Sequence, residues 1–147
     1  MKTLRTLALL CIAIIAVSCK GNQKSKIDSE FKKEINKAIE VHDDVMPKMS
    51  EINQKIRSLD TLAGVDSLTI EKSKKRLKDA HEEMMTWMRD FSNAFSTKEI
   101  KEGLQTDKAD SIKIKTNTAK NYRESALKMK ESVNSSIEEA KKLLNNI

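Results

Sequence analysis

Glycine and proline are scarce in this chain, and their positions limit how it can fold. The 147 residues include three glycines and one proline, and beyond residue 26 only Gly64, Gly103 and Pro47 interrupt the sequence. Glycine commonly follows the last residue of a helix because it adopts left-handed backbone angles without steric cost. Gly64 and Gly103 therefore divide the chain into three long helical segments.

The first two segments repeat their seam residues at alternating intervals of four and three, and the third repeats them at intervals of three or four in a less regular order. In residues 27–62 the seam is Phe31, Ile35, Ala38, His42, Val45, Met49, Ile52, Ile56 and Leu59. In residues 68–98 it is Ile70, Lys74, Leu77, His81, Met84, Met88, Phe91 and Phe95. In residues 107–145 it is Ile112, Thr116, Ala119, Tyr122, Ala126, Met129, Val133, Ile137, Ala140 and Leu144.

This pattern is typical of helices that pack at a shallow angle with coiled-coil-like seams, and short turns make neighbouring helices antiparallel. We therefore predict an all-α fold, an antiparallel up-down-up three-helix bundle over residues 27–147. Asp66 or Ser67 is expected to cap the second helix, because both side chains accept hydrogen bonds from a helix start.

The first 19 residues have the three parts of a bacterial lipoprotein signal. A short basic start is followed by the apolar run 7–17, then by Ser18 and Cys19. Such a signal is removed, and the cysteine becomes the new N-terminus that carries acyl chains such as palmitate. An apolar run of about 11 residues is too short to cross a ~30 Å hydrocarbon core as a helix. We predict a signal peptide (residues 1–18), lipidation at Cys19 and a flexible tether (residues 19–26).

Composition after the signal fits a domain held in the cell envelope. No cysteine follows Cys19, so the domain has neither a disulfide nor a thiolate ligand, as suits an oxidising compartment. Nucleic acid is a poor partner in that compartment. The formal charge of +6 includes Lys2 and Arg5 of the signal, and the remaining +4 is weak evidence for a basic surface that binds anionic lipid headgroups or cell-wall polymers. The expected contacts are the membrane, through the lipid, and an envelope protein.

Two histidines fall on the first two seams, each with methionines about one turn away. If the chain folds back at Gly64, two residues lie at the same level of the antiparallel pair when their numbers add up to about 128. Imidazole and thioether donors favour Cu(I) or Ag(I), and an indole ring can cover a bound cation. Pro47 lacks the N–H that would bond the Asp43 carbonyl, which predicts a kink at this level. The candidate ligands are His42, Met46, Met49, His81, Met84, Met85 and Met88, with Trp87 as a possible lid.

The same residues have other interpretations. A methionine-rich seam is often simple packing, with each histidine bonded to a carboxylate such as Glu82 or Glu83. Non-covalent haem held by one histidine and one methionine is a further alternative. A zinc-protease motif fails because Met85 stands where H-E-x-x-H needs its second histidine. His42 and Asp43 are expected to point about 100° apart, too far for a dyad.

Two stretches resemble paired motifs of small Bacteroidetes lipoproteins labelled "viral A-type inclusion protein". They are His42-Asp-Asp-Val-Met-Pro-Lys-Met49 and Met84-Met-Thr-Trp-Met-Arg89, and the resemblance covers residues 30–95. It implies a bacterial lipoprotein and no particular activity. Residues after Cys19 are basic, unlike the acidic stretch of surface-exported lipoproteins of that phylum, which favours the outer membrane facing the periplasm. We therefore expect a non-catalytic interaction or structural module, with Cu(I)/Ag(I) binding or haem binding as the alternatives.

Overall fold

The computed structural model describes residues 26–145, and all regular structure within them is helical. Helix 26–45 is followed by α2 (Lys48–Asp60), α3 (Ser67–Ala94), α4 (Thr97–Glu102) and α5 (Ala109–Asn145), with no strand among the described residues. The prediction of an all-α fold is confirmed. The predicted signal peptide, Cys19 and the tether up to residue 25 lie outside the described residues.

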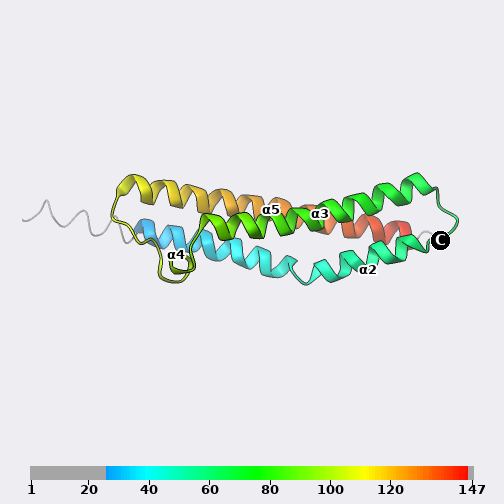
Figure 1. Cartoon of the computed structure of the whole chain (residues 1–147), viewed down its shortest axis with the longest axis horizontal. Coiled ribbons are helices and arrows are strands. Elements are labelled where there is room, and N and C mark those ends of the chain that lie inside the picture. The colour runs from blue at the N-terminus through cyan, green and yellow to red at the C-terminus, as the bar shows by residue number, and fades with distance from the viewer. Residues whose placement is uncertain (1–25, 146–147) are drawn as a thin grey trace, which may run out of the picture.

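The long helices lie alongside one another and form an elongated rod (Figure 1). Helix 26–45 and α2 run in one direction, α3 returns beside them, and α5 runs the length of the rod again; α2, α3 and α5 each pack against the other two. The 37 residues of α5 span about 55 Å at the rise of an α-helix. No helix among residues 26–145 is both long enough and apolar enough to cross a membrane.

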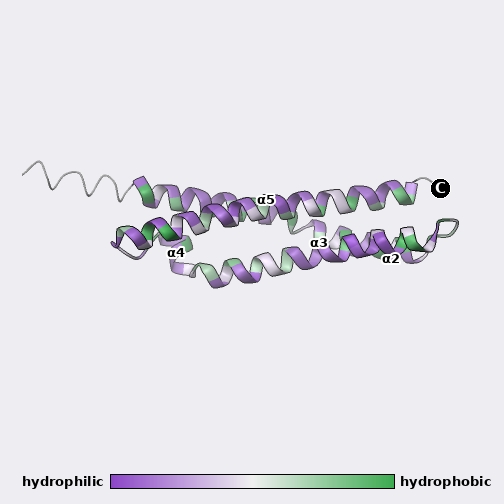
Figure 2. Ribbon diagram, turned by 90° about the horizontal axis from the view of Figure 1, so that it is seen from above, coloured by the Kyte–Doolittle hydropathy of each residue, from purple (hydrophilic) through white to green (hydrophobic). Residues whose placement is uncertain are grey.

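Seam positions fill the core of the rod along its whole length. Hydrophilic and hydrophobic residues alternate along each long helix, as expected of helices with one apolar face (Figure 2). Phe31, Ile35 and Leu77 are fully buried, and so is Val133 on α5. Lys74 is a charged residue at a seam position of α3. Its ammonium is paired with Asp60 at the end of α2, at a distance of 2.6 Å.

The first predicted helix is two helices, separated at Met46 and Pro47. The Met46 N–H still donates to the His42 carbonyl at 2.9 Å, but Pro47 has no N–H to continue the ladder, and α2 starts at Lys48. A break therefore replaces the expected kink.

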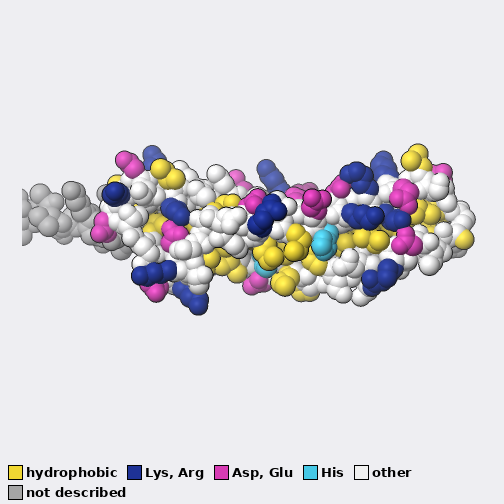
Figure 3. All heavy atoms as spheres, viewed as in Figure 1, with side chains coloured by type: hydrophobic (Ala, Val, Ile, Leu, Met, Phe, Trp, Pro, Cys, Tyr) yellow, Lys and Arg dark blue, Asp and Glu magenta, His cyan; other side chains and the backbone are white. Residues whose placement is uncertain are grey.

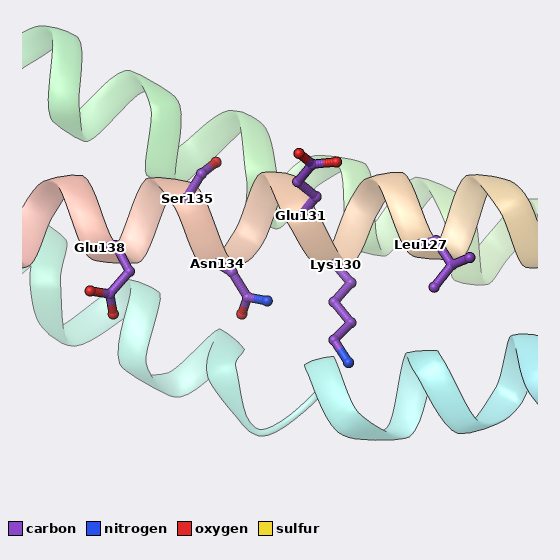
Figure 4. Close-up of a pocket in the computed structure, with 6 residues that line it drawn as sticks. All are labelled: Leu127, Lys130, Glu131, Asn134, Ser135 and Glu138. Atoms are coloured by element: carbon purple, nitrogen blue, oxygen red, sulfur yellow. The ribbon is translucent and has the colours of Figure 1, made fainter.

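Two side chains of α5 span this break. Lys130 lies 2.7 Å from Asp44 before the break, and Lys48 after it donates to Asn134 at 2.6 Å. The hydrogen bond from Lys130 lowers the pKa of Asp44. Figure 4 shows Lys130 and Asn134 pointing from α5 toward the break, in a surface depression of about 480 Å³ that is lined by α5 alone.

The second predicted helix is also shorter than expected. It ends at Ala94, because Phe95 adopts an extended conformation and Ser96 caps the separate helix α4 through a reciprocal bond with Glu99. At the start of α3 the carboxylate of Asp66 accepts the Thr69 N–H at 3.0 Å, which confirms one of the two predicted caps.

Gly103 ends α4 and brings the chain against the start of helix 26–45. Its φ is 97° and ψ is −170°, a conformation that only glycine adopts readily. The following N–H, that of Leu104, donates to the Asp28 carboxylate at 2.8 Å. A contact between residues far apart in sequence thus closes this end of the rod.

The aromatic side chains gather in the half of the rod that contains residue 26. Tyr122 makes edge contacts with Trp87, Phe91 and Phe95, with ring centroids between 5.5 and 6.2 Å apart. Phe31 adds an edge contact to Phe95 at 5.8 Å. Residues 43–86 and 123–145 contain no Phe, Trp or Tyr, so the other half is filled by aliphatic side chains and methionine.

Candidate functional site

His42 lies just before the helix break, with its ring against Trp87. The ring centroids are 5.6 Å apart and the planes 21° from parallel, and 15% of the histidine side chain is exposed. The Nδ1 atom is 2.9 Å from an oxygen of Asp43. A carboxylate accepts hydrogen bonds, so Nδ1 carries the hydrogen and Nε2 keeps its lone pair.

The expectation that His42 and Asp43 cannot meet is wrong. Nδ1 is the ring nitrogen closest to the backbone, so the short side chain of the next residue reaches it although the two Cβ atoms point apart. His42 is therefore bonded to Asp43 and not to Glu82 or Glu83. The sequence contains a signal for this hydrogen bond, because a residue with a carboxylate directly follows the histidine.

The Nε2 atom of His42 is buried without a hydrogen-bond partner among the described residues, and Ser73 Oγ is the other such atom. A serine hydroxyl can turn toward a carbonyl of its own helix, whereas a ring nitrogen is fixed by its ring. Leaving a buried polar atom unpaired costs about 1–3 kcal/mol. Nε2 is thus a fixed, shielded lone pair that nothing in residues 26–145 uses.

The two histidines do not share one level of the rod. His42 lies against Trp87, and His81 is six residues from Trp87 on the continuous helix α3, about 9 Å along its axis. An ion with bonds of about 2 Å spans at most about 4 Å between two nitrogens. The convergence of both imidazoles predicted from a fold at Gly64 is therefore wrong.

The break at Pro47 does not cause this offset. His42 contacts Trp87, and their numbers sum to 129, so the register predicted from a fold at Gly64 holds at this level. A sum of about 128 places His81 opposite residue 47, which is about 7.5 Å beyond His42 along the first helix, so the two imidazoles are offset even in uninterrupted helices.

The candidate methionines divide into buried and exposed groups. Met84 is 2% exposed and belongs to the core, and Met49 packs against that core. Met46, Met85 and Met88 are 56%, 46% and 37% exposed. The structure thus leaves three of the five candidate thioethers at the surface.

At about 100° per residue, these exposed methionines project away from the flanks that α5 covers, which places them toward the boundary between helix 26–45 and α3. The opposite flank of the first helix is covered by α5, where Lys120 pairs with Glu30, and the opposite flank of α3 is covered where Arg76 pairs with Glu139. Figure 3 shows both histidine side chains (cyan) on one face of the rod, with hydrophobic side chains (yellow) between them.

Trp87, which the sequence suggested as a possible lid, is a buried side chain that stacks on His42. It is 7% exposed, and it stacks on Phe91 as well as His42. Its indole N–H donates to the Tyr122 carbonyl at 3.2 Å and to Ser125 Oγ at 3.0 Å. The indole is therefore held in place from α5.

Within residues 26–145, no group of three or more His, Cys, Asp or Glu side chains is arranged to hold a metal ion. A site at His42 would therefore have to include donors of another kind, such as the thioethers of nearby methionines.

The chain matches no protein-family model, no curated protein and no solved structure. The resemblance to small Bacteroidetes lipoproteins therefore stays a prediction from the motifs around His42 and Trp87.

Proposed function

We propose that this protein is a non-catalytic lipoprotein of the bacterial envelope, anchored at Cys19 to the outer membrane and facing the periplasm. Its helices form an up-down-up three-helix bundle that serves as an interaction or structural module. The observation that carries this proposal is the position of residue 26, where the described chain begins, at one end of the rod (Figure 1).

That position suits a domain held by its end. Cys19 precedes Lys26 by seven residues, which reach at most about 25 Å when extended. The rod then continues for about 55 Å, so the turn at Gly64 can lie up to about 80 Å from the lipid. Such a molecule can bridge a membrane and a partner at a distance.

Ion pairs between helices support a structural role. Lys120 pairs with Glu30 near residue 26, and Lys141 pairs with Glu51 beyond the break. Arg123 pairs with Glu34, of which only 8% is exposed. Helix 26–45 and α2 are thus fastened to α5 at several levels.

Inhibition of signal peptidase II tests the anchor. Treated cells should accumulate a heavier precursor, and Cys19→Ser should release the protein from the membrane fraction. Cys11→Ser is the matched control, because it removes a cysteine inside the apolar run. An unchanged band on inhibition, together with membrane retention of the Cys19→Ser variant, would refute lipidation at Cys19.

A further inference from the structure

We propose that His42, Met46 and Met88 form a binding site for one soft monovalent cation, Cu(I) or Ag(I). The first donor is Nε2 of His42, the shielded ring nitrogen that has no hydrogen-bond partner among the described residues. This inference does not depend on lipidation of Cys19.

Asp43 prepares His42 for this task. A metal-binding histidine usually donates its other ring N–H to a carboxylate or carbonyl, which fixes the tautomer and raises the basicity of the ligating nitrogen. The bond of 2.9 Å from Nδ1 to Asp43 has this arrangement. In the neutral ring with that tautomer, Nε2 presents the lone pair that a metal ion binds.

Helix spacing places two methionines near His42. Met46 is four residues after His42, and side chains at this spacing share one face of a helix. Met88 follows Trp87, on whose ring His42 stacks, and faces the same boundary between helix 26–45 and α3. At 56% and 37% exposure, both side chains can turn toward Nε2 without leaving a hole in the core.

The donor set selects the cation. Thioether and imidazole are the soft and borderline ligands that favour Cu(I), whereas Mg²⁺ and Ca²⁺ require several oxygen ligands. Zn²⁺ sites use Cys, His, Asp or Glu, and no cluster of these occurs in residues 26–145.

His81 provides a control within the same chain. It has Met85 four residues later, the same spacing as His42 and Met46, but it lies about 9 Å along α3 from Trp87. A site centred on Nε2 of His42 therefore requires His42 and not His81.

Silver titration of the full chain in detergent tests the proposal. Both cysteines lie in the first 19 residues, so Cys11→Ser and Cys19→Ser remove every thiol that would compete for Ag(I). The only tryptophan, Trp87, touches His42 and reports binding by fluorescence. Methionine labelled with ¹³C in its methyl group identifies the ligands by NMR.

We expect one equivalent of Ag(I) to bind and to shift the methyl signals of Met46 and Met88, but not that of buried Met129. His42→Ala should weaken binding at least tenfold and His81→Ala less than twofold. Asp43→Asn should weaken it about 10–100-fold. Asp43 is largely exposed, so this variant keeps the fold and separates a ligand effect from misfolding.

Three results would overturn the proposal. One is the absence of stoichiometric Ag(I) binding. Another is unchanged affinity in the His42→Ala variant. The third is an equal loss in His81→Ala and His42→Ala, which would require both imidazoles at one ion.

Discussion

Replacing Gly103 with alanine tests how the N-terminal end of the rod is closed. The φ of 97° and ψ of −170° cost a residue with a side chain about 1–3 kcal/mol. A Cβ at this position would lie 2.6 Å from one Asp28 oxygen and 2.7 Å from the other, so the carboxylate must move. Moving it breaks the bond from the Leu104 N–H, a charged hydrogen bond of about 1.5–3 kcal/mol. We expect a total loss of about 2.5–6 kcal/mol.

Gly64 is the matched control, because its φ of 81° is also positive but a Cβ there meets nothing within 4 Å. Gly64→Ala should therefore cost only the backbone term, about 1–2 kcal/mol. Urea unfolding followed by circular dichroism at 222 nm measures both free energies. In an Asp28→Ala background the cost of Gly103→Ala should fall by about 1.5–3 kcal/mol, since the hydrogen bond and the clash with Asp28 are already gone. The remaining close neighbour is Lys32 Cε at 2.7 Å, near the end of a flexible side chain that can move. Equal losses for the two glycine variants, or no coupling to Asp28, would refute this account.

Three further predictions concern the interior and the caps. Glu34→Gln should lower the free energy of unfolding in urea by about 1–3 kcal/mol, because Arg123 loses a buried partner. Lys75→Ala, which removes an exposed ion pair, should change it by less than about 0.5 kcal/mol. Similar losses in the two variants would contradict the burial of Glu34. Trp87→Phe should cost about 1–2 kcal/mol, since the Tyr122 carbonyl and Ser125 hydroxyl lose their shared donor, and a neutral result in the same assay would mean that water replaces it. Burial opposes ionisation of Glu99, but hydrogen bonds from Ser96 and Lys115 outweigh it and lower the pKa of Glu99 below the ordinary value of 4.5. The ionised Glu99 therefore stabilises the fold fully above pH 4.5, and this stabilisation is lost as the pH falls through the folded-state pKa. Thermal unfolding between about pH 5 and pH 3 should show a smaller loss of stability for Glu99→Gln than for the unmodified protein, and parallel profiles would exclude this role.

Periodic features of the sequence predict most of the fold. Seam residues such as Phe31 and Leu77 are buried as expected, because a 4-3 repeat leaves a helix only one face to bury. Helix α4 has a readable signal as well, since Ser96 and Glu99 have the spacing of a capping box. The docking of Leu104 on Asp28 joins residues 76 positions apart, and no local pattern reports it.

The candidate site is less predictable because it depends on register and rotamers. His81 is six residues from Trp87 on α3 and therefore lies at a different height from His42, an offset that membership of the seam alone does not reveal. The bond between His42 and Asp43 depends on side-chain torsions that residue spacing does not determine. Burial divides the methionines by the flank of the helix they occupy, so Met84 enters the core while Met85 stays outside.

The uneven distribution of aromatic rings gives the molecule a direction. Each well-placed aromatic pair adds about 0.5–1.5 kcal/mol beyond its buried area, and all such pairs among the described residues lie in the half that contains residue 26. The half beyond Pro47 lacks them, so its amide hydrogens should exchange sooner than those around Phe95. Local unfolding then starts at the end of the rod near Gly64 and does not extend into the aromatic half. The end near Gly64 can therefore change its conformation while the half that contains residue 26 stays folded.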